Sequence, residues 1–290
     1  MSVYDFAVAP FVEFEFMRRA LIGALALAIG AAPIGVFLML RRMSLTGDAM
    51  AHAILPGAAV GYLIAGLSLP AMTIGGLVAG LAVAFAAGAL ARASVLKEDA
   101  TLAAFYLISL ALGVLIVSMK GSNVDLMHVL FGSVLALDDG ALLLIAGIAS
   151  VTLLVLALIY RPLVLECMDP QFLRSVSGAG LVAHFGFIGL VVLNLVGGFH
   201  ALGTLLAVGI MMLPAAAARM WTDDVTALIG VAVLIAMGSS VAGLLVSYHG
   251  EAPSGPSIIL VAGAVYGLSL AFGRSGGLVW KLLPARHLEA

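Results

Sequence analysis

Long apolar runs separated by short polar breaks make up most of the sequence. A helix that crosses a ~30 Å hydrocarbon core needs roughly 20 predominantly apolar residues. Runs close to that length predict spans at 17–40, 44–66, 69–91, 100–119, 140–160, 180–197, 201–219, 225–247 and 257–273. The sixth and seventh runs almost touch, so the count falls by one if they are not both full crossings. The pattern therefore predicts eight or nine transmembrane helices.

Basic residues concentrate in alternate connections between these spans. The connection with Arg41 and Arg42 belongs to this basic set, and the opposite connections hold one basic residue, Lys120. The other members of the basic set are Arg92, Lys97, Arg161, Arg174, Arg219, Arg274, Lys281 and Arg286. Because cytoplasmic loops are enriched in Lys and Arg, we expect the N-terminus outside and the C-terminus in the cytoplasm. Arg18 and Arg19 fall at the outer end of the first span, where we expect them to snorkel to the interface.

Composition supports the same class of protein. The chain is 63% hydrophobic and 10% charged, with a mean hydropathy of +1.23. Soluble domains carry about 25% charged residues. We expect an all-α polytopic membrane protein, in contact with lipid and formed by a single domain, 1–290; the resemblance described below places it in the bacterial inner membrane. An interfacial lead-in over 1–16 precedes the bundle, 17–273, and a cytoplasmic tail, 274–290, follows it.

Asp48 and His52 are the candidate functional residues inside the membrane. They are the sole charged residue and the sole His between Ser44 and Ala91. Their spacing of four places them on one face of a helix. If Arg41 and Arg42 mark the surface, Asp48 lies roughly 10 Å and His52 roughly 15 Å below it. Polar groups at that depth are costly and usually face a polar path or a partner.

A carboxylate and an imidazole suit Mn²⁺, Zn²⁺ or Fe²⁺ better than Ca²⁺. Two ligands are too few to hold a metal ion, and a symmetric homodimer meeting at this helix would supply four. Pro56 should break the helix one turn further on and free a backbone carbonyl, a third type of ligand. Cys167 is the single cysteine, which excludes a Cys-cluster metal site.

Other chemistry is missing from the sequence. No P-loop is present, so the chain does not bind nucleotide phosphates in that way. No basic run indicates nucleic acid. The outer loop 120–139 contains a short apolar helix pattern, 123–132. In the inner loop 161–179, Asp169 is expected to cap a short helix that begins at Pro170. From its residues alone, this helix needs no role beyond shaping the connection.

Four stretches together resemble the permease of the manganese, zinc and iron ABC importers, the ABC-3 family. The strongest is Leu40–Gly57, which is similar to the family signature nearly residue for residue. The others are Asn123–Gly132, Leu202–Arg219 and Pro253–Pro256, which resemble the family's outer helix, a late core helix and the turn before the last span. The resemblance covers most of the chain.

The resemblance implies a homodimeric permease that works with a cytoplasmic ABC ATPase dimer and an extracytoplasmic metal-binding protein. Asp48 and His52 match residues that line the family's translocation path, and no cofactor is bound permanently. Asp169, Pro170, Gln171, Phe172 and Arg174 match the helix that docks on the ATPase. The following stretch, Ser175–Gly180, lacks the family's usual Ala-x-Gly-Val run. His184 and His200 are secondary candidates for a metal contact or a gate.

Two rival functions remain open from the residues alone. Asp48 and His52 would also serve as a proton relay in a proton-coupled secondary metal transporter, which would need no ATPase. An ABC permease for a larger metal chelate would need a wide vestibule, against which the many small residues argue weakly.

Overall fold

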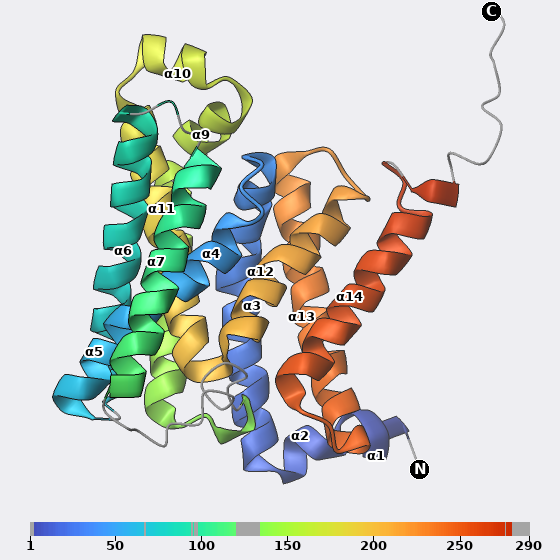
Figure 1. Ribbon diagram of the computed structural model, residues 1–290. Coiled ribbons are helices and arrows are strands. Elements are labelled where there is room, and N and C mark those ends of the chain that lie inside the picture. Colours follow the sequence, from blue (N-terminus) through green and yellow to red (C-terminus); the bar gives the residue numbers. More distant parts are fainter. Residues whose placement is uncertain are drawn as a thin grey trace, which may run out of the picture.

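The computed structural model describes residues 3–66, 68–93, 95, 98–119, 134–275 and 277–279 (Figure 1). Helices form most of these ranges, and no β-strand occurs within them. The outer helix predicted at 123–132 lies outside the described residues. The elements are α1 (Val3–Ala7), α2 (Ala9–Glu13), α3 (Glu15–Leu40), α4 (Thr46–Ala53), α5 (Leu55–Ala65), α6 (Leu69–Ala93), α7 (Glu98–Met119), η1 (Val134–Ala136), α9 (Asp139–Met168), α10 (Pro170–Val176), α11 (Ala179–Leu202), α12 (Thr204–Arg219), α13 (Val225–Gly250) and α14 (Ser254–Phe272).

Each of the nine predicted spans is helical. Seven are long and apolar enough to cross a membrane, and two shorter apolar helices, Ala100–Ile116 within α7 and Thr204–Arg219, accompany them. In Figure 1, α3 begins at the end of the bundle opposite to the end where α14 finishes. This arrangement requires an odd number of crossings, so nine crossings fit the structure better than eight. Gly203, with a φ of 91°, makes the one-residue turn that separates α11 from α12.

The inner connection after the fifth span is shorter than predicted. We expected that span to end at 160, but α9 continues to Met168. Pro162 lies inside the helix without ending it. A proline removes one backbone donor, and neighbouring helices can compensate for that loss in a membrane. Residues that the sequence places in a loop, Glu166 among them, therefore stand on the last turn of a long helix.

A rigid turn joins α3 to α4. The Met43 N–H donates to Leu38 O at 2.9 Å, and the Arg42 N–H donates to Met39 O at 3.0 Å. These two bonds define a Schellman motif, in which the residue after the C-cap is left-handed and is usually glycine. Here Arg42 adopts a φ of 58°. The turn redirects the chain so that α4 starts on a fixed course from the end of α3.

Close backbone packing joins α5 to α6. A Cβ on Gly57 would lie 1.9 Å from Gly75 O, and one on Gly61 would lie 2.4 Å from Ala71 O. Real Cβ atoms essentially never come this close to backbone, so the two helices touch because these positions are glycine. Small residues at such interfaces are typical of helix pairs in lipid, where dispersion contacts replace the hydrophobic effect.

The outer end of the first span also explains Arg18 and Arg19. Arg19 pairs with Glu15 at 2.8 Å and with Asp139 at 3.1 Å, at the start of α9. The Arg18 side chain donates to Val12 O at 2.8 Å. The two cations therefore fix the lead-in helices and the start of α9 around the outer end of α3. They do not mark a second cytoplasmic surface.

We expect Gly57→Ala to destabilise the protein by about 1–3 kcal/mol, because the added methyl group must push two backbones apart. The matched control is Gly230→Ala on α13, where a new Cβ meets nothing within 4 Å. Thermal unfolding in detergent should show a lower midpoint for the first variant and an unchanged midpoint for the second. Equal midpoints for Gly57→Ala and the wild type would contradict the close packing.

Candidate functional site

The span that contains Asp48 and His52 is a broken helix, as Pro56 predicts. It forms α4 and α5, with the break at Ile54. Because Pro56, the second residue of α5, has no N–H, the helical hydrogen bond from position 56 to His52 O cannot form. The Ala53 carbonyl accepts a hydrogen bond of 3.0 Å from the Ser109 hydroxyl of α7. The carbonyl that the proline leaves without its usual helical donor is that of His52, so the expectation of a freed backbone ligand stays a prediction.

Asp48 and His52 share the open face of α4. The opposite face buries Ala49, Met50 and Ala53 in the bundle. The Asp48 side chain is 66% exposed and the His52 side chain 27% exposed. Asp48 Oδ1 and His52 Nε2 are 3.9 Å apart, which is too long for a direct hydrogen bond. The two candidate metal ligands therefore lie side by side on α4 without a hydrogen bond between them.

The His52 ring is oriented by its neighbours. It lies over the ring of Tyr106 on α7, with centroids 6.0 Å apart and an angle of 30° between the planes. Its Nδ1 is buried and has no hydrogen-bond partner among the described residues. A buried ring nitrogen without a partner is costly, and such groups are often completed by an ion, a water or a partner chain.

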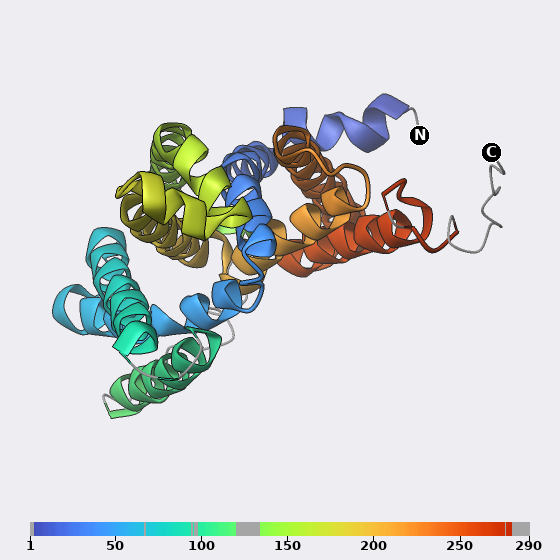
Figure 2. The same ribbon diagram turned by 90° about the horizontal axis from the view of Figure 1, so that it is seen from above.

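The arrangement of the helices leaves this face of α4 open. In the view from above, α5, α6 and α7 form one arm of the molecule and α13 and α14 form the other (Figure 2). α4 runs along the inner side of the curve between these arms. No three His, Cys, Asp or Glu residues gather closely enough to hold a metal ion in the described part of a single chain. A metal site at Asp48 and His52 would need ligands from elsewhere.

The short helix α10 forms as predicted. The Asp169 carboxylate accepts hydrogen bonds from the N–H groups of Gln171 at 3.1 Å and Phe172 at 2.9 Å. Pro170 follows at the first helical position, where its missing N–H costs nothing. This N-cap holds a seven-residue helix at the end of the bundle that the basic residues assign to the cytoplasm (Figure 1).

The two faces of α10 have different roles. Leu173 is buried against the bundle and lies close over Gly180 at the start of α11. Phe172 and Val176 are 51% and 68% exposed, and their spacing of four places them on one face. A short capped helix with an exposed aromatic residue is a suitable surface for a partner protein. The side chains of Pro170 and Arg174 lie outside the described ones.

A buried polar cluster near α10 was not predicted from the sequence. Arg41 Nη2 lies 3.3 Å from Glu166 Oε1 and within hydrogen-bonding distance of His184 Nδ1. His184 Nδ1 is also 3.6 Å from Glu166 Oε1. The side chains are only 11%, 13% and 10% exposed, respectively. A guanidinium can only donate, so His184 Nδ1 accepts in this contact.

The position of His184 in this cluster argues against His184 as a metal contact. The nitrogen that faces the cluster is engaged with a cation, and a metal ion there would meet the charge of Arg41. Arg41 is further held over the Phe187 ring, 5.3 Å from its centroid. The possible role of His200 stays a prediction, because its side chain lies outside the described ones.

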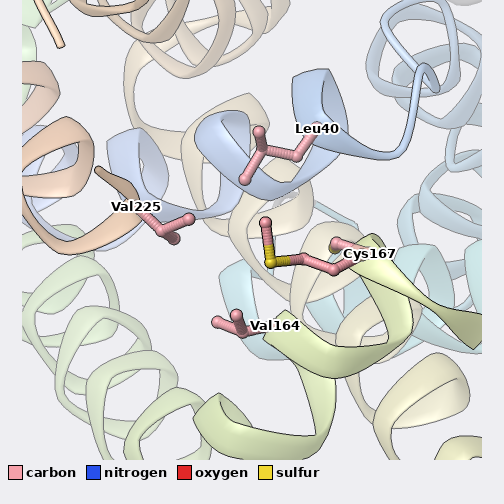
Figure 3. A pocket seen from close by; sticks show the side chains of 5 residues that line it. Leu40, Val164, Cys167 and Val225 are labelled. Atoms are coloured by element: carbon pink, nitrogen blue, oxygen red, sulfur yellow. The ribbon is translucent and has the colours of Figure 1, made fainter. Parts of the chain in front are cut away.

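A small apolar cavity of about 100 Å³ is lined by Leu40 and Cys167, the sequence neighbours of Arg41 and Glu166. Figure 3 shows Leu40 of α3, Val164 and Cys167 of α9 and Val225 of α13 around it. Sites for drug-sized ligands usually exceed about 300 Å³. The cavity is therefore a packing gap beside the end of α9 rather than a ligand site.

A family comparison identifies this architecture. The model of the ABC 3 transport family matches residues 13–273. The chain belongs to the ABC 3 transport family. It is 32% identical over 294 residues to the manganese transport system membrane protein MntC of Halalkalibacterium halodurans, and the match covers 100% of this chain and 99% of the relative.

Two further relatives agree with this assignment. The chain is 30% identical over 263 residues to the chelated iron transport system membrane protein YfeD of Yersinia pestis, with 91% of this chain and 87% of the relative covered. Among solved structures, it resembles PsaBC from Streptococcus pneumoniae in complex with Fab, with a TM-score of 0.82 and 29% identity. That match covers 94% of this chain and 97% of the other. The protein is thus a multi-pass membrane permease of an ABC transporter, in which ATP hydrolysis belongs to a separate subunit.

Proposed function

We propose that the chain is the permease of an importer for divalent transition-metal ions, with Mn²⁺, Zn²⁺ or Fe²⁺ as cargo and no resident cofactor. The observation that carries this proposal is the Asp48 and His52 pair on the open face of α4. Relatives named for manganese and iron transport align over nearly the whole chain. Carboxylate and imidazole donors suit these cations. Asp48 and His52 would line the path, which opens alternately to the two sides of the membrane.

A second copy of the chain would complete the metal site. One chain supplies two donors, and Asp48 is mostly exposed along the inner side of the curve in Figure 2. A two-fold axis beside α4 would bring two such pairs together and give four ligands, because the same patch meets itself in a symmetric dimer. The pairing would also cover the polar face of α4 from lipid, where charged groups are costly.

The partners act at opposite ends of the bundle. An ATPase dimer would dock on α10 through Phe172 and Val176, with Asp169 and Gln171 fixing the start of that helix. An extracytoplasmic metal-binding protein would deliver the cation at the other end. The family assignment favours this ATP-driven scheme over a proton-coupled carrier. A larger chelate as cargo remains the second candidate, because one relative is named for chelated iron.

We expect Asp48→Asn and His52→Gln each to lower metal uptake by about tenfold or more, because each removes a ligand. The measurement is uptake of radiolabelled Mn²⁺ and Zn²⁺ by cells that lack their own importers and express the permease with its ATPase and binding protein. Glu13→Gln, at an exposed position of the lead-in, is the matched control. Wild-type uptake in either site variant, at equal membrane abundance, would refute the site. Uptake by the permease alone would favour the proton-coupled carrier.

We expect Asp48→Cys, made in a Cys167→Ser background, to cross-link two copies of the chain with a short bifunctional thiol reagent. Cross-linking follows if the two Asp48 positions face each other across the symmetry axis. Leu234→Cys is the control, since the Leu234 side chain is 69% exposed and belongs to α13, in the arm away from α5, α6 and α7. The yield is read as dimer on a denaturing gel. A monomeric Asp48→Cys protein, or equal dimer from both positions, would rule out the shared site.

We expect Phe172→Ala to weaken ATPase binding by about 30-fold, because truncating an aromatic anchor at an interface costs roughly 2 kcal/mol or more. Co-purification of the ATPase with the tagged permease measures the effect. Leu181→Ala removes a similarly exposed side chain, 56% exposed, from the start of α11 and should retain the ATPase. Normal retention by Phe172→Ala would show that α10 does not dock through this face.

A further inference from the structure

The buried cluster of Arg41, Glu166 and His184 connects three elements that the proposed function requires to move together. Arg41 is the C-cap residue of α3 and begins the turn into α4. Glu166 lies three residues before Asp169, the N-cap of α10. His184 lies in the second turn of α11, which follows α10. The cluster therefore ties both flanks of the docking helix to the start of the helix that carries Asp48 and His52.

On the α10 side, short connections and a buried contact couple α10 closely to α9 and α11. Leu173 holds α10 against the bundle, and α10 is linked to α9 by Asp169 and to α11 by Ser177 and Gly178. The Asp169 N–H also donates to Leu165 O at 2.8 Å, within the last turn of α9. A displacement of α10 must therefore displace the end of α9 or the start of α11, which carry Glu166 and His184.

On the α4 side, the connection is equally short. The bonds of Arg42 to Met39 and of Met43 to Leu38 fix the turn that follows Arg41. The Thr46 N–H then donates to Met43 O at 3.0 Å at the first residue of α4. A force on the Arg41 side chain acts on the end of α3, next to this hydrogen-bonded turn. Asp48 lies two residues beyond Thr46, so a displacement of this turn would also displace Asp48.

The cluster is also able to rearrange. Arg41 Nη1 and Glu166 Oε2 are buried and have no hydrogen-bond partner among the described residues. The pair therefore has donor and acceptor capacity that another conformation can use. The cavity in Figure 3 adds room, because Cys167 and Val164 of α9 face Leu40 and Val225 across it. The end of α9 is thus held by the ion pair with Arg41 and borders unfilled space on the side of Leu40 and Val225.

We propose that Arg41, Glu166 and His184 are positioning residues that transmit the movement of α10 to α4, and so link the ATPase to the metal path. This inference rests on the proposed function, since it assigns a route between the two sites named there. The Arg41 and Glu166 side chains are buried between α3, α9 and α11. They therefore serve neither as metal ligands nor as docking contacts. A purely structural ion pair would stabilise the same three helices without affecting how transport depends on ATP.

The test is the amount of Mn²⁺ taken up per ATP hydrolysed by the complete transporter in proteoliposomes. Glu166→Gln and Arg41→Gln should each lower this ratio by about tenfold while ATP hydrolysis continues. The double variant should be no worse than either single variant, because residues acting through one contact are not additive. Asp223→Asn is the matched control, since it breaks the more exposed pair of Arg219 and Asp223 at the same end of the bundle. An unchanged ratio in Glu166→Gln would overturn the proposal, as would uptake and hydrolysis falling together with the amount of folded protein.

A second measurement does not depend on the cargo. Spin labels replace Leu45, 80% exposed just before α4, and Leu234 on α13, in a Cys167→Ser chain assembled with its ATPase. Trapping the ATPase with ATP and vanadate should change the distance between the labels in the otherwise wild-type complex, and Glu166→Gln should abolish the change. An equal change in Glu166→Gln, or none in the wild-type complex, would overturn the link. A wild-type complex that shows the change but takes up no divalent metal would refute the proposed function and leave the link standing.

Discussion

The arrangement of this protein depends on the requirement that backbone polar groups in a membrane find partners within the protein. Pro56 removes one helical donor from the span of α4 and α5, and the Ser109 hydroxyl of α7 donates to Ala53 O at the same junction. The break allows α4 and α5 to take separate courses while α7 holds the junction. α5 then packs tightly on α6 through Gly57 and Gly61. As a result, α4 keeps its polar face on the inner side of the molecule, where Asp48 and His52 stand together without bonding to each other.

Charge organises the cytoplasmic end in a different way. Arg41 follows the end of α3 and is held over the Phe187 ring. It reaches Glu166 because α9 extends beyond residue 160. Its other partner is His184 of α11. Removing one member of a buried ion pair is strongly destabilising, typically by about 3–5 kcal/mol, because the other charge is left uncompensated. The pair thus holds together the ends of helices that are widely separated in sequence. It also lies between the surface where a partner ATPase would bind and the helix where a cation would pass.

The sequence predicted much of this structure because membrane helices leave strong local signals. The apolar runs located the nine spans, Pro56 located the break, and Asp169 with Pro170 located the capped helix α10. Contacts between distant residues left no such signal. Arg41 was interpreted as a surface marker and Glu166 as a loop residue, yet they meet across 125 positions of sequence. A hint was present, since both lie near span ends on the same side of the membrane. Arg19 and Asp139 form a similar distant pair at the outer end.

Electron spin-echo spectroscopy of Mn²⁺ bound to the assembled transporter tests most directly whether His52 takes part in the metal path. An imidazole nitrogen bound to Mn²⁺ modulates the echo, and the modulation changes when the histidines carry ¹⁵N. We expect the wild-type transporter to show this modulation and the His52→Gln transporter to lose it while remaining assembled. Bound Mn²⁺ without nitrogen modulation, or modulation that persists in His52→Gln, would contradict the assignment of His52 to the path.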